Sequence, residues 1–404
     1  MLKDKQVVLG ITGGIAAYKA AEIVRQIVKG GGQVHVIMTR SAQEFIAPLT
    51  LQTLSGNPVT TELFQLYQER EIGHIALAQR AQILVIAPAT ANIIGKIAHG
   101  IADDILSTVV MAAKAPVLMA PAMNEAMWEN PIVQDNIRSL KKRGYHFIDP
   151  GWGDLACGAQ GTGRMAEIED IIDEMAALLT PKDFRGQKVL VTAGPTREML
   201  DPVRFISNPS SGKMGFAVAR ALRQRGAQVT LISGPTALAP PRMVNVIPVQ
   251  TAEEMRSAVQ KHFAETDIVI KTAAVADYRP KKISPEKIKK GAASLSLEME
   301  KTRDILGELG MKKGQKLLIG FAAETRKVNA FALEKLQKKN LDLIVANDVG
   351  RKGSGFGSDM NEVRLIFRDG RVETLPALPK EEIAHILLDR IITLQKESRA
   401  RKKK

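Results

Sequence analysis

Short, nearly continuous apolar runs alternate with amphipathic stretches along the first part of the chain. Residues 6–12 form an apolar run that ends at a glycine pair, residues 13–14, and residues 15–28 then show helical periodicity. Three glycines at 30–32 end this helix, and the next apolar run covers residues 33–39. This order predicts a βαβ unit, whose strands are buried on both faces of a parallel sheet.

The alternation continues through the first half of the chain and restarts in the second. In the first half, further strands are predicted at 83–87 and 115–120, and a helix at 167–179 closes it. The sequence Gly-Ala-Gln-Val at 226–229 mirrors Gly-Gly-Gln-Val at 31–34, so both halves are predicted to open with the same unit. The second half is predicted to contain strands at 188–193, 227–233, 267–273, 317–321, 341–347 and 363–367, and helices at 216–225, 330–339 and 380–395.

This pattern predicts the α/β fold class, with two doubly wound, mostly parallel-sheet domains. The first domain covers residues 1–180 and the second covers residues 188–398. Between them, residues 181–187 are mostly polar and include a proline and a glycine, which predicts a linker. Residues 399–404 form a basic tail, which we expect to be solvated and disordered.

The composition excludes several classes of protein. Of the 404 residues, 45% are apolar and 25% are charged, as in ordinary globular proteins, and no apolar run approaches the roughly 20 residues that cross a membrane. The single cysteine, Cys157, excludes an intrachain disulfide, and no four Cys or His residues have the spacing of a structural zinc site. The charged N-terminus leads directly into a strand, so we expect no signal peptide, no membrane partner and a cytoplasmic location.

The formal charge of +14 first suggests nucleic acid as a partner. Five of these charges lie in the tail, however, and their removal leaves +9. Aromatic residues make up only 4% of the chain, too few for the stacking surfaces of single-strand binders. We therefore expect small phosphorylated substrates and no specific nucleic acid.

Small residues follow the first predicted strand. Gly13 and Gly14 place bare backbone N–H groups at the start of a helix, where phosphate binds well. Their spacing is not Gly-x-Gly-x-x-Gly, so a mononucleotide such as FMN is favoured over NAD. A tight turn without a ligand explains the same glycines equally well.

Polar residues also follow later strands of the first half. Asn124 lies in Pro-Ala-Met-Asn-Glu-Ala-Met-Trp, residues 121–128, directly after a predicted strand, where catalytic groups of open α/β sheets lie. A loop that only plugs the surface is an equal alternative. His74 is predicted to open the helix before the strand at 83–87, where a lone histidine is more often structural than catalytic. Cys157 lies among glycines that indicate a mobile, exposed flap, and an incidental loop cysteine is the alternative.

In the second half, a glycine–serine turn and many lysines follow the strands. Ser-Ser-Gly-Lys-Met-Gly at 210–215 precedes a helix, and five lysines lie between 281 and 290. Lys335 and Lys339 are one turn apart on one helix face. Such lysines usually form only a solvated surface, but here they also fit a polyphosphate site.

Taken together, these segments resemble the family of bifunctional phosphopantothenoylcysteine decarboxylase/phosphopantothenate–cysteine ligases of coenzyme A biosynthesis. The resemblance covers the whole chain outside the basic tail. It implies a flavodoxin-like flavoprotein domain followed by a Rossmann-like ligase domain. The motifs that carry it are residues 73–75, 121–128, 156–165, 204–215, 273–280, 287–290, 320–325 and 339–348.

The resemblance implies that the first domain is an FMN-dependent decarboxylase. In that family the flavin oxidises the CH₂–SH group to a thioaldehyde, the carboxylate leaves as CO₂, and the enethiolate is then reduced. By resemblance, His74 assists the oxidative decarboxylation, Asn124 holds the substrate carboxylate, and Cys157 donates the proton that completes the reduction. The residues expected to contact FMN are Gly13, Gly14, Thr39, Ser41 and Ser107.

The resemblance implies that the second domain is a CTP-dependent ligase, which joins 4′-phosphopantothenate to L-cysteine through an acyl-cytidylate with Mg²⁺. By resemblance, Lys287 supports formation of the acyl-cytidylate, and Asn208 with Arg204 supports attack by cysteine. The residues expected to bind CTP are Ala273, Asp277, Lys287, Phe321, Lys335 and Lys339, and Asp277 is also a candidate Mg²⁺ ligand. Arg303 stands where the family usually has proline, which leaves the geometry of that loop open.

The resemblance also implies a homo-oligomer, a dodecamer built from trimers of the first domain and dimers of the second. The main alternative is a flavin-binding regulatory subunit of the same fold without turnover, against which Cys157 and the second domain argue. A nucleic-acid-binding flavoprotein is suggested only by the charge.

Overall fold

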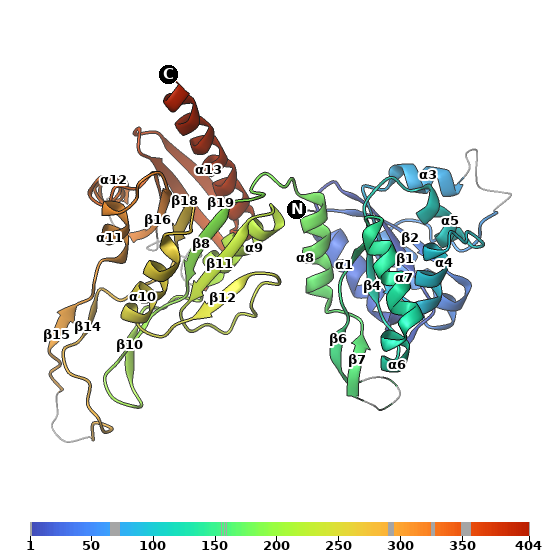
Figure 1. Cartoon of the computed structure of the whole chain (residues 1–404), viewed down its shortest axis with the longest axis horizontal. Coiled ribbons are helices and arrows are strands. Elements are labelled where there is room, and N and C mark those ends of the chain that lie inside the picture. The colour runs from blue at the N-terminus through green and yellow to red at the C-terminus, as the bar shows by residue number, and fades with distance from the viewer. Residues whose placement is uncertain are drawn as a thin grey trace. The chain divides into compact units, whose positions relative to one another are not determined.

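The computed structural model describes residues 2–64, 73–154, 156, 158, 160–289, 295–324, 328–348 and 357–403. The chain divides into two compact units, Met1–Pro181 and Lys182–Lys404 (Figure 1). Each unit has its own sheet and its own hydrophobic core, so each is described by itself.

The first unit contains a five-stranded parallel sheet with the strand order β2-β1-β3-β4-β5. The strands at 6–12, 33–39, 83–87 and 115–120 are confirmed, with ends that differ by one or two residues. The elements are β1 (Gln6–Ile11), η1 (Ile15–Lys19), α1 (Ala20–Lys29), β2 (Gln33–Met38), η2 (Arg40–Glu44), α2 (Pro48–Ser55), α3 (Gly73–Arg80), β3 (Ile83–Ala89), α4 (Ala91–Ala98), α5 (Ile105–Ala112), β4 (Val117–Pro121), α6 (Glu125–Glu129), α7 (Pro131–Lys142), β5 (His146–Phe147), β6 (Gly151–Asp154), β7 (Gln160–Arg164) and α8 (Ile168–Leu179).

Helices cover both faces of this sheet because its strands are apolar on both sides. Leu9 of β1 packs in a cluster with Ile23 of α1 and Met175 of α8. Val8, which points to the other face, packs in a cluster with Val109 of α5 and Leu140 of α7. The near-continuous apolar runs of the sequence therefore correspond to strands buried between two helical layers.

The second unit contains an eight-stranded sheet with the order β12-β11-β8-β13-β16-β17-β18-β19. Its first six strands are parallel, and β18 and β19 add an antiparallel edge. The elements are β8 (Lys188–Ala193), β9 (Arg197–Met199), β10 (Phe205–Ser207), α9 (Lys213–Gln224), β11 (Gln228–Ser233), β12 (Asn245–Pro248), α10 (Ala252–Phe263), β13 (Ile268–Lys271), β14 (Tyr278–Pro280), β15 (Met299–Lys301), α11 (Ile305–Met311), β16 (Leu317–Glu324), α12 (Val328–Lys338), β17 (Leu343–Asp348), β18 (Met360–Phe367), β19 (Val372–Pro379) and α13 (Lys380–Lys403).

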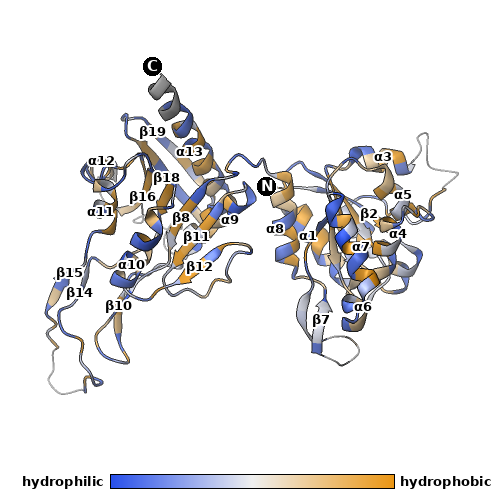
Figure 2. Ribbon diagram, in the orientation of Figure 1, coloured by the Kyte–Doolittle hydropathy of each residue, from blue (hydrophilic) through white to orange (hydrophobic). Residues whose placement is uncertain are grey.

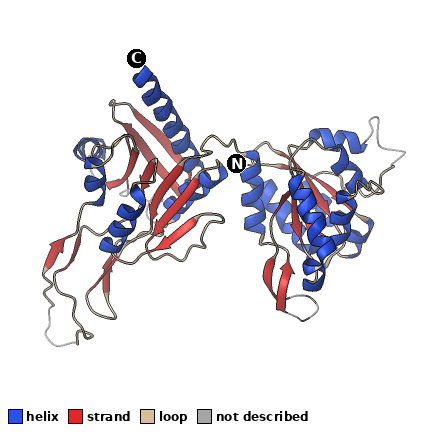
Figure 3. Ribbon diagram, in the orientation of Figure 1, coloured by secondary structure: helices blue, strands red, loops and turns tan. Residues whose placement is uncertain are grey.

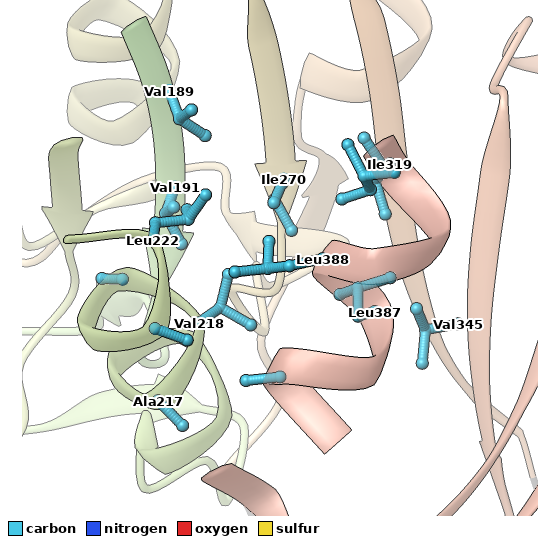
Figure 4. Packing of buried hydrophobic residues seen from close by; sticks show 14 of the residues in the cluster. Val189, Val191, Ala217, Val218, Leu222, Ile270, Ile319, Val345, Leu387 and Leu388 are labelled. Carbon is cyan, nitrogen blue, oxygen red and sulfur yellow. The ribbon is translucent and has the colours of Figure 1, made fainter. Parts of the chain in front are cut away.

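Helices α9 and α13 cover one face of the second sheet, and α10, α11 and α12 cover the other. Figure 4 shows Val218 and Leu222 of α9 and Leu388 of α13 against strand residues such as Val191 and Ile270. On the opposite face, strand residues pack against Met255, Leu306 and Leu336 of the other three helices. In Figure 2 hydrophobic colour marks the central strands of each sheet. The doubly wound, mostly parallel architecture is confirmed for both halves.

Several elements differ from the sequence-based expectations. The helix expected at 15–28 begins as the 3₁₀ turn η1, and the flap around residue 157 is carried by the antiparallel hairpin β6–β7. Two further antiparallel pairs, β9–β10 and β14–β15, lie in segments for which the sequence predicted no strand (Figure 3). These strands have only three to five residues, too few to show a repeating apolar pattern.

Residues 181–187 were expected to be a linker and residues 399–404 a disordered tail, and the structure differs from both expectations in part. Phe184 is fully buried in the core of the second unit, and the guanidinium of Arg225 lies 5.1 Å from the centre of its ring. Much of the predicted linker is therefore part of the second unit. Helix α13 continues through Lys403, because the basic residues of the tail are good helix formers.

In the part of the chain that the structure describes, none of the helices is both long and apolar enough to span a lipid bilayer.

Candidate functional site

The first unit has a topological switch point between the parallel strands β1 and β3, where the order of the strands in the sheet reverses. The chain leaves β1 toward β2 on one side and later returns to β3 on the other, and ligands of open α/β sheets bind at such a point, beyond the carboxyl ends of the strands. The buried hydroxyl of Thr12 donates to the carbonyl of Pro88 at 2.7 Å and accepts from the backbone N–H of Thr90 at 3.2 Å. These bonds hold the ends of the two strands in place.

Four of the five residues expected to contact FMN come together here. A Cβ atom on Gly13 would lie only 2.4 Å from Cβ of Ser41, and Thr39 precedes Ser41 after β2. A Cβ atom on Gly14 would meet only Thr90, at 3.7 Å. The bare backbone at the start of a helical segment fits a phosphate group of a flavin mononucleotide.

Ser107, the fifth expected FMN residue, lies in the first turn of α5. Its hydroxyl donates to the carboxylate of Asp104 at 2.9 Å, and the Asp104 carboxylate accepts the backbone N–H of Ser107 at 2.8 Å. The two residues form a capping box that fixes the start of α5. Asp104 therefore precedes α5 as its N-cap.

His74 and Asn124 both lie at the carboxyl edge of the first sheet. His74 is the second residue of α3, as predicted, and a helix that leads into the amino end of a parallel strand begins at the sheet's carboxyl edge. Asn124 follows β4 directly and caps α6, where its side-chain oxygen accepts the N–H of Ala126 at 2.9 Å. The predicted position of both residues is confirmed, whereas their chemical roles stay predictions.

The hairpin β6–β7 is attached beside Asn124. The carboxylate of Glu125 accepts the N–H of Thr162 at 2.9 Å, and the N–H of Met123 donates to the carbonyl of Gly163 at 3.0 Å. Cys157 falls between the two strands of this hairpin and lies outside the described residues. The segment that carries the thiol is thus fixed at its base to the residues on either side of Asn124.

The second unit has its own topological switch point, between β8 and β13, and a cavity of about 720 Å³ opens there. This volume is in the range of small-molecule sites. Its wall is built from the carboxyl ends of β13, β16 and β17, the start of α9, and the residues around the start of α11 and the end of α12.

Six of the residues predicted for the ligase reaction line this cavity, and the structure therefore brings them together. The side-chain amide of Asn208 donates to the carbonyls of Ala274 and Val275, both at 3.2 Å, and so holds the loop that follows β13. The six residues are Asn208, Ala273, Asp277, Phe321, Lys335 and Lys339.

Arg204 and Lys287 do not line the cavity. The guanidinium of Arg204 donates to the buried carboxylate of Asp201 at 2.6 and 2.9 Å and also to the carbonyl of Ile288. The N–H of Ile288 donates back to Asp201 at 3.1 Å. Arg204 therefore fixes the segment that contains Lys287 through its neighbour.

The Asp201 carboxylate is the centre of this network. Burial alone would raise its pKa, but hydrogen bonds from Ile288, Val203 and Arg204 hold the pKa far below the ordinary value of an aspartate. Asp201 is therefore charged at all physiological pH values.

Sequence reasoning missed several residues of the cavity. Lys213 at the start of α9 pairs with Asp359 at 2.6 Å, and Lys380 at the start of α13 lines the same wall. Burial and the neighbouring Lys213 lower the pKa of Lys380. Lys213 could have been noticed from Ser-Ser-Gly-Lys, but nothing in the sequence connects Lys380 to that turn.

Lys271, the last residue of β13, was also missed, because it ends an apolar strand. Burial, together with the charges of Lys335 and Lys339, lowers the pKa of Lys271 to about 8, against the opposite effect of Asp304 and Asp277.

Arg303, at which the resemblance leads us to expect proline, lies on the wall of the cavity between β15 and α11. Its neighbours are held firmly. The N–H of Thr302 donates to the carbonyl of Asp277 at 3.0 Å, and Asp304 caps α11 by accepting the N–H of Gly307 at 3.1 Å. The loop that carries Arg303 is therefore well fixed on both sides of the arginine.

Within the described ranges, no group of three or more His, Cys, Asp or Glu side chains is arranged to hold a metal ion by itself. The Asp277 carboxylate on the cavity wall fits a different arrangement, in which Mg²⁺ is bound by one carboxylate and by the phosphates of a substrate.

The chain matches two protein families in succession. Residues 1–180 match the family described as Flavoprotein, and residues 184–394 match the family described as DNA/pantothenate metabolism flavoprotein C-terminal domain. The first unit is thus a flavoprotein domain, and the two matches correspond closely to the two units of the fold.

Relatives match this chain over almost the full length of both proteins. The chain is 48% identical over 402 residues to the coenzyme A biosynthesis bifunctional protein CoaBC of Bacillus subtilis (strain 168), covering 98% of this chain and 99% of that protein. It is 45% identical over 405 residues to the protein of the same name from Escherichia coli (strain K12), covering 99% and 100%. A crystal structure of the C-terminal domain of a coenzyme A biosynthesis bifunctional protein CoaBC is 45% identical, with a TM-score of 0.47, over 54% of this chain and 99% of that chain. The chain belongs to the family of coenzyme A biosynthesis bifunctional proteins CoaBC.

Proposed function

We propose that the chain carries out two successive reactions of coenzyme A biosynthesis. The second unit ligates 4′-phosphopantothenate with L-cysteine at the expense of CTP, and the first unit decarboxylates the product to 4′-phosphopantetheine with FMN. The observation that carries this proposal is the cavity of the second unit, which gathers six of the predicted ligase residues at one topological switch point.

In the ligation, the carboxylate of 4′-phosphopantothenate attacks the α-phosphorus of CTP and pyrophosphate leaves, which gives an acyl-cytidylate. The amine of cysteine then attacks the acyl carbon, and CMP leaves. Lys335 and Lys339 offset the negative charge of the nucleotide, and the ring of Phe321 provides a flat apolar surface for the base. Mg²⁺ bound by the phosphates and Asp277 would withdraw charge from the leaving pyrophosphate.

Asn208 and the Arg204 network act on the second half of this reaction. Asn208 fixes the loop 273–275 through two hydrogen bonds and borders the cavity, so it is placed to orient the acyl group. Arg204 acts as a positioning residue, because its guanidinium binds Asp201 and the carbonyl next to Lys287. Lys287 supports formation of the acyl-cytidylate.

In the decarboxylation, FMN supplies a reversible two-electron oxidation of the substrate thiol. Gly13, Gly14, Thr39 and Ser41 would hold the phosphate end of this cofactor, and Ser107 is the further expected contact. Asn124 orients the substrate carboxylate, His74 assists the oxidative decarboxylation, and the thiol of Cys157 donates the proton that completes the reduction.

We further expect the protein to work in the cytoplasm as a homo-oligomer, a dodecamer of first-unit trimers and second-unit dimers. Large apolar side chains of the first unit, among them Leu49, Ile132 and Trp152, are about 70% exposed, which supports assembly with other chains.

The test is to incubate the yellow, purified protein with 4′-phosphopantothenate, cysteine, CTP and Mg²⁺. We expect 4′-phosphopantetheine, CMP, pyrophosphate and CO₂. Without CTP, added 4′-phosphopantothenoylcysteine should still be decarboxylated. A flavin-containing protein that turns over neither substrate would instead favour a regulatory subunit of the same fold.

A further inference from the structure

We propose that Lys271 is a further nucleotide-binding residue of the second unit, whose amino group binds a phosphate of CTP and takes up a proton from solvent as the nucleotide enters. This inference rests on the proposed ligase function, because the anion that it assigns to Lys271 is the nucleotide of that reaction.

The position of Lys271 places its side chain in the nucleotide cavity. Lys271 pairs in register with Thr192 of β8 and with Gly320 of β16, so it lies at the topological switch point of the sheet. Side chains alternate along a strand, so Lys271 shares a face with Val269, which packs among the helices α10 to α12. Lys271 therefore extends toward the end of the cavity formed by α11 and α12.

Four charged groups act on Lys271 from the elements around it. Lys335 and Lys339 belong to the α12 side, Asp304 caps α11, and Asp277 lies on the loop after β13. Asp304 is already paired with Lys339 at 2.9 Å. Three lysines and two aspartates thus act on one another at this end of the cavity, and the phosphates of a nucleoside triphosphate can add negative charge there.

A comparison within the same unit distinguishes this lysine from a structural one. Lys313 is 7% exposed, and its ammonium is fixed by the carboxylate of Asp342 at 2.5 Å and the carbonyl of Asn340 at 3.2 Å. The side-chain amino group of Lys271 has no hydrogen bond or ion pair to any residue that the structure describes. A partly buried amine without a partner is costly to keep charged, so it gains most from an anion that arrives with the ligand.

Because burial lowers the pKa of Lys271 to about 8, about half of the amine is neutral at pH 8 before the nucleotide binds. A bound phosphate favours the charged form and raises this pKa. Binding therefore takes up about half a proton at pH 8, less at pH 7 and more at pH 9. Through linkage, the Kd for CTP rises about tenfold between pH 7 and pH 9.

The experiment is calorimetric titration of the full chain with CTP and Mg²⁺ at pH 7, 8 and 9, in two buffers of different ionisation enthalpy. The difference between the buffers gives the number of protons taken up. K271R keeps the positive charge but does not titrate in this range, so its uptake should vanish and its Kd should stay level with pH. K271M should lose both uptake and affinity. K312M, which replaces an exposed lysine outside the cavity, is the matched control and should behave as the unmodified chain.

The outcomes separate this inference from the function on which it rests. CTP binding without proton uptake, or uptake that persists in K271M, would overturn the role of Lys271 and leave the ligase proposal standing. Uptake with 4′-phosphopantothenate alone, at equal size, would assign the lysine to the other substrate and also overturn it. If CTP does not bind at all, the ligase proposal itself fails. Thermal unfolding of both variants shows that each is folded.

Discussion

At their topological switch points the two units of this protein are built alike. They differ in the lysines, which border only the crevice of the second unit. In the first unit, Thr12 at the end of β1 bonds the backbone of Thr90 after β3. In the second unit, Thr192 near the end of β8 accepts the N–H of Ala273 after β13 at 3.3 Å. Both first strands then lead into a turn that contains glycine.

The difference lies in what borders each crevice. Gly13, Gly14 and Ser41 leave an uncharged backbone surface in the first unit, whereas Lys271, Lys335 and Lys339 gather in the second. A surface of backbone N–H groups suits a cofactor that stays bound, and a cluster of lysines suits a polyphosphate that arrives and leaves. The shared fold thus supplies a crevice, and a few residues at the strand ends determine which ligand the crevice suits.

The largest effect that separates the two units is expected from Cys157→Ser. A serine hydroxyl is a much weaker acid than a thiol, so decarboxylation should fall by about 10²- to 10⁴-fold. Ligation in the same sample should not change, and it serves as the internal control. Detection of an oxidised enethiol product by mass spectrometry would support the role, whereas normal turnover to 4′-phosphopantetheine would remove it.

Gly13→Val is expected to abolish flavin binding and leave ligation intact. The new side chain would begin 2.4 Å from Cβ of Ser41, and such overpacking costs about 1–3 kcal/mol of stability. The measurement is the flavin absorbance per chain after purification. Gly14→Ala is the matched control for stability, because its methyl group meets nothing closer than 3.7 Å. A yellow Gly13→Val protein would contradict the position of the phosphate cradle.

Lys339→Met tests the other side of the comparison. It removes a cation and the partner of Asp304, so the KM for CTP should rise about 10- to 100-fold, as for the loss of one charge-assisted hydrogen bond. Decarboxylation of added 4′-phosphopantothenoylcysteine should be unchanged. Lys338→Met, at an exposed neighbouring position outside the cavity, is the control. Equal effects of both variants would show that general charge, and not this site, binds the nucleotide.

Asp201→Asn is expected to alter the pH dependence of the second unit. The folded state holds the pKa of Asp201 below its unfolded value, so the charged carboxylate stabilises the fold above about pH 4, and this contribution is lost as the pH falls. The variant should therefore unfold at a lower temperature at pH 6 and lose less stability between pH 6 and pH 3.

The control is Asp359→Asn, whose carboxylate is exposed and has a lowered pKa mainly through Lys213. It should have a smaller effect on the same melting curves. The melting temperatures of Asp201→Asn and of the unmodified chain could also fall by the same amount between pH 6 and pH 3. That result would show that the network around Asp201 does not depend on the charge of the carboxylate.

The smallest effect is expected from deletion of residues 399–404. Both reactions should keep their rates, because the deletion removes only the end of α13. Retention on a heparin column should decrease, since five positive charges are lost from a formal +14. Loss of either activity would instead give the end of the helix a role in one of the two units.

The sequence predicted the parts of the fold that follow from apolar periodicity. The parallel strands of both sheets and the helix before Lys339 could be located because their residues alternate with turns over long stretches. The hairpin β14–β15 could not, since its strands have three residues each and pair with partners about 20 positions away. Phe184 was assigned to a linker because a single aromatic residue among polar neighbours does not reveal what it packs against.

The candidate site was predicted unevenly for a similar reason. Asp277, Phe321 and Lys339 could be placed because they belong to motifs that resemble a family. Lys271 and Lys380 could not, because the cavity that unites them is formed by strands and helices more than 100 residues apart in the chain. Only the folded sheet shows that a lysine at the end of an apolar strand faces a cluster of other lysines.

The contact at Gly163 has a consequence for how this family can evolve. A Cβ atom at this position would lie 2.1 Å from the carbonyl oxygen of Met123, and its φ of +152° is unfavourable for other residues. Every amino-acid substitution at this position is therefore expected to detach β7 from the residue before Asn124. In a library of all substitutions selected by growth without added pantetheine, this codon should be as intolerant as one that encodes a reacting group, although its residue takes no part in any bond that is made or broken.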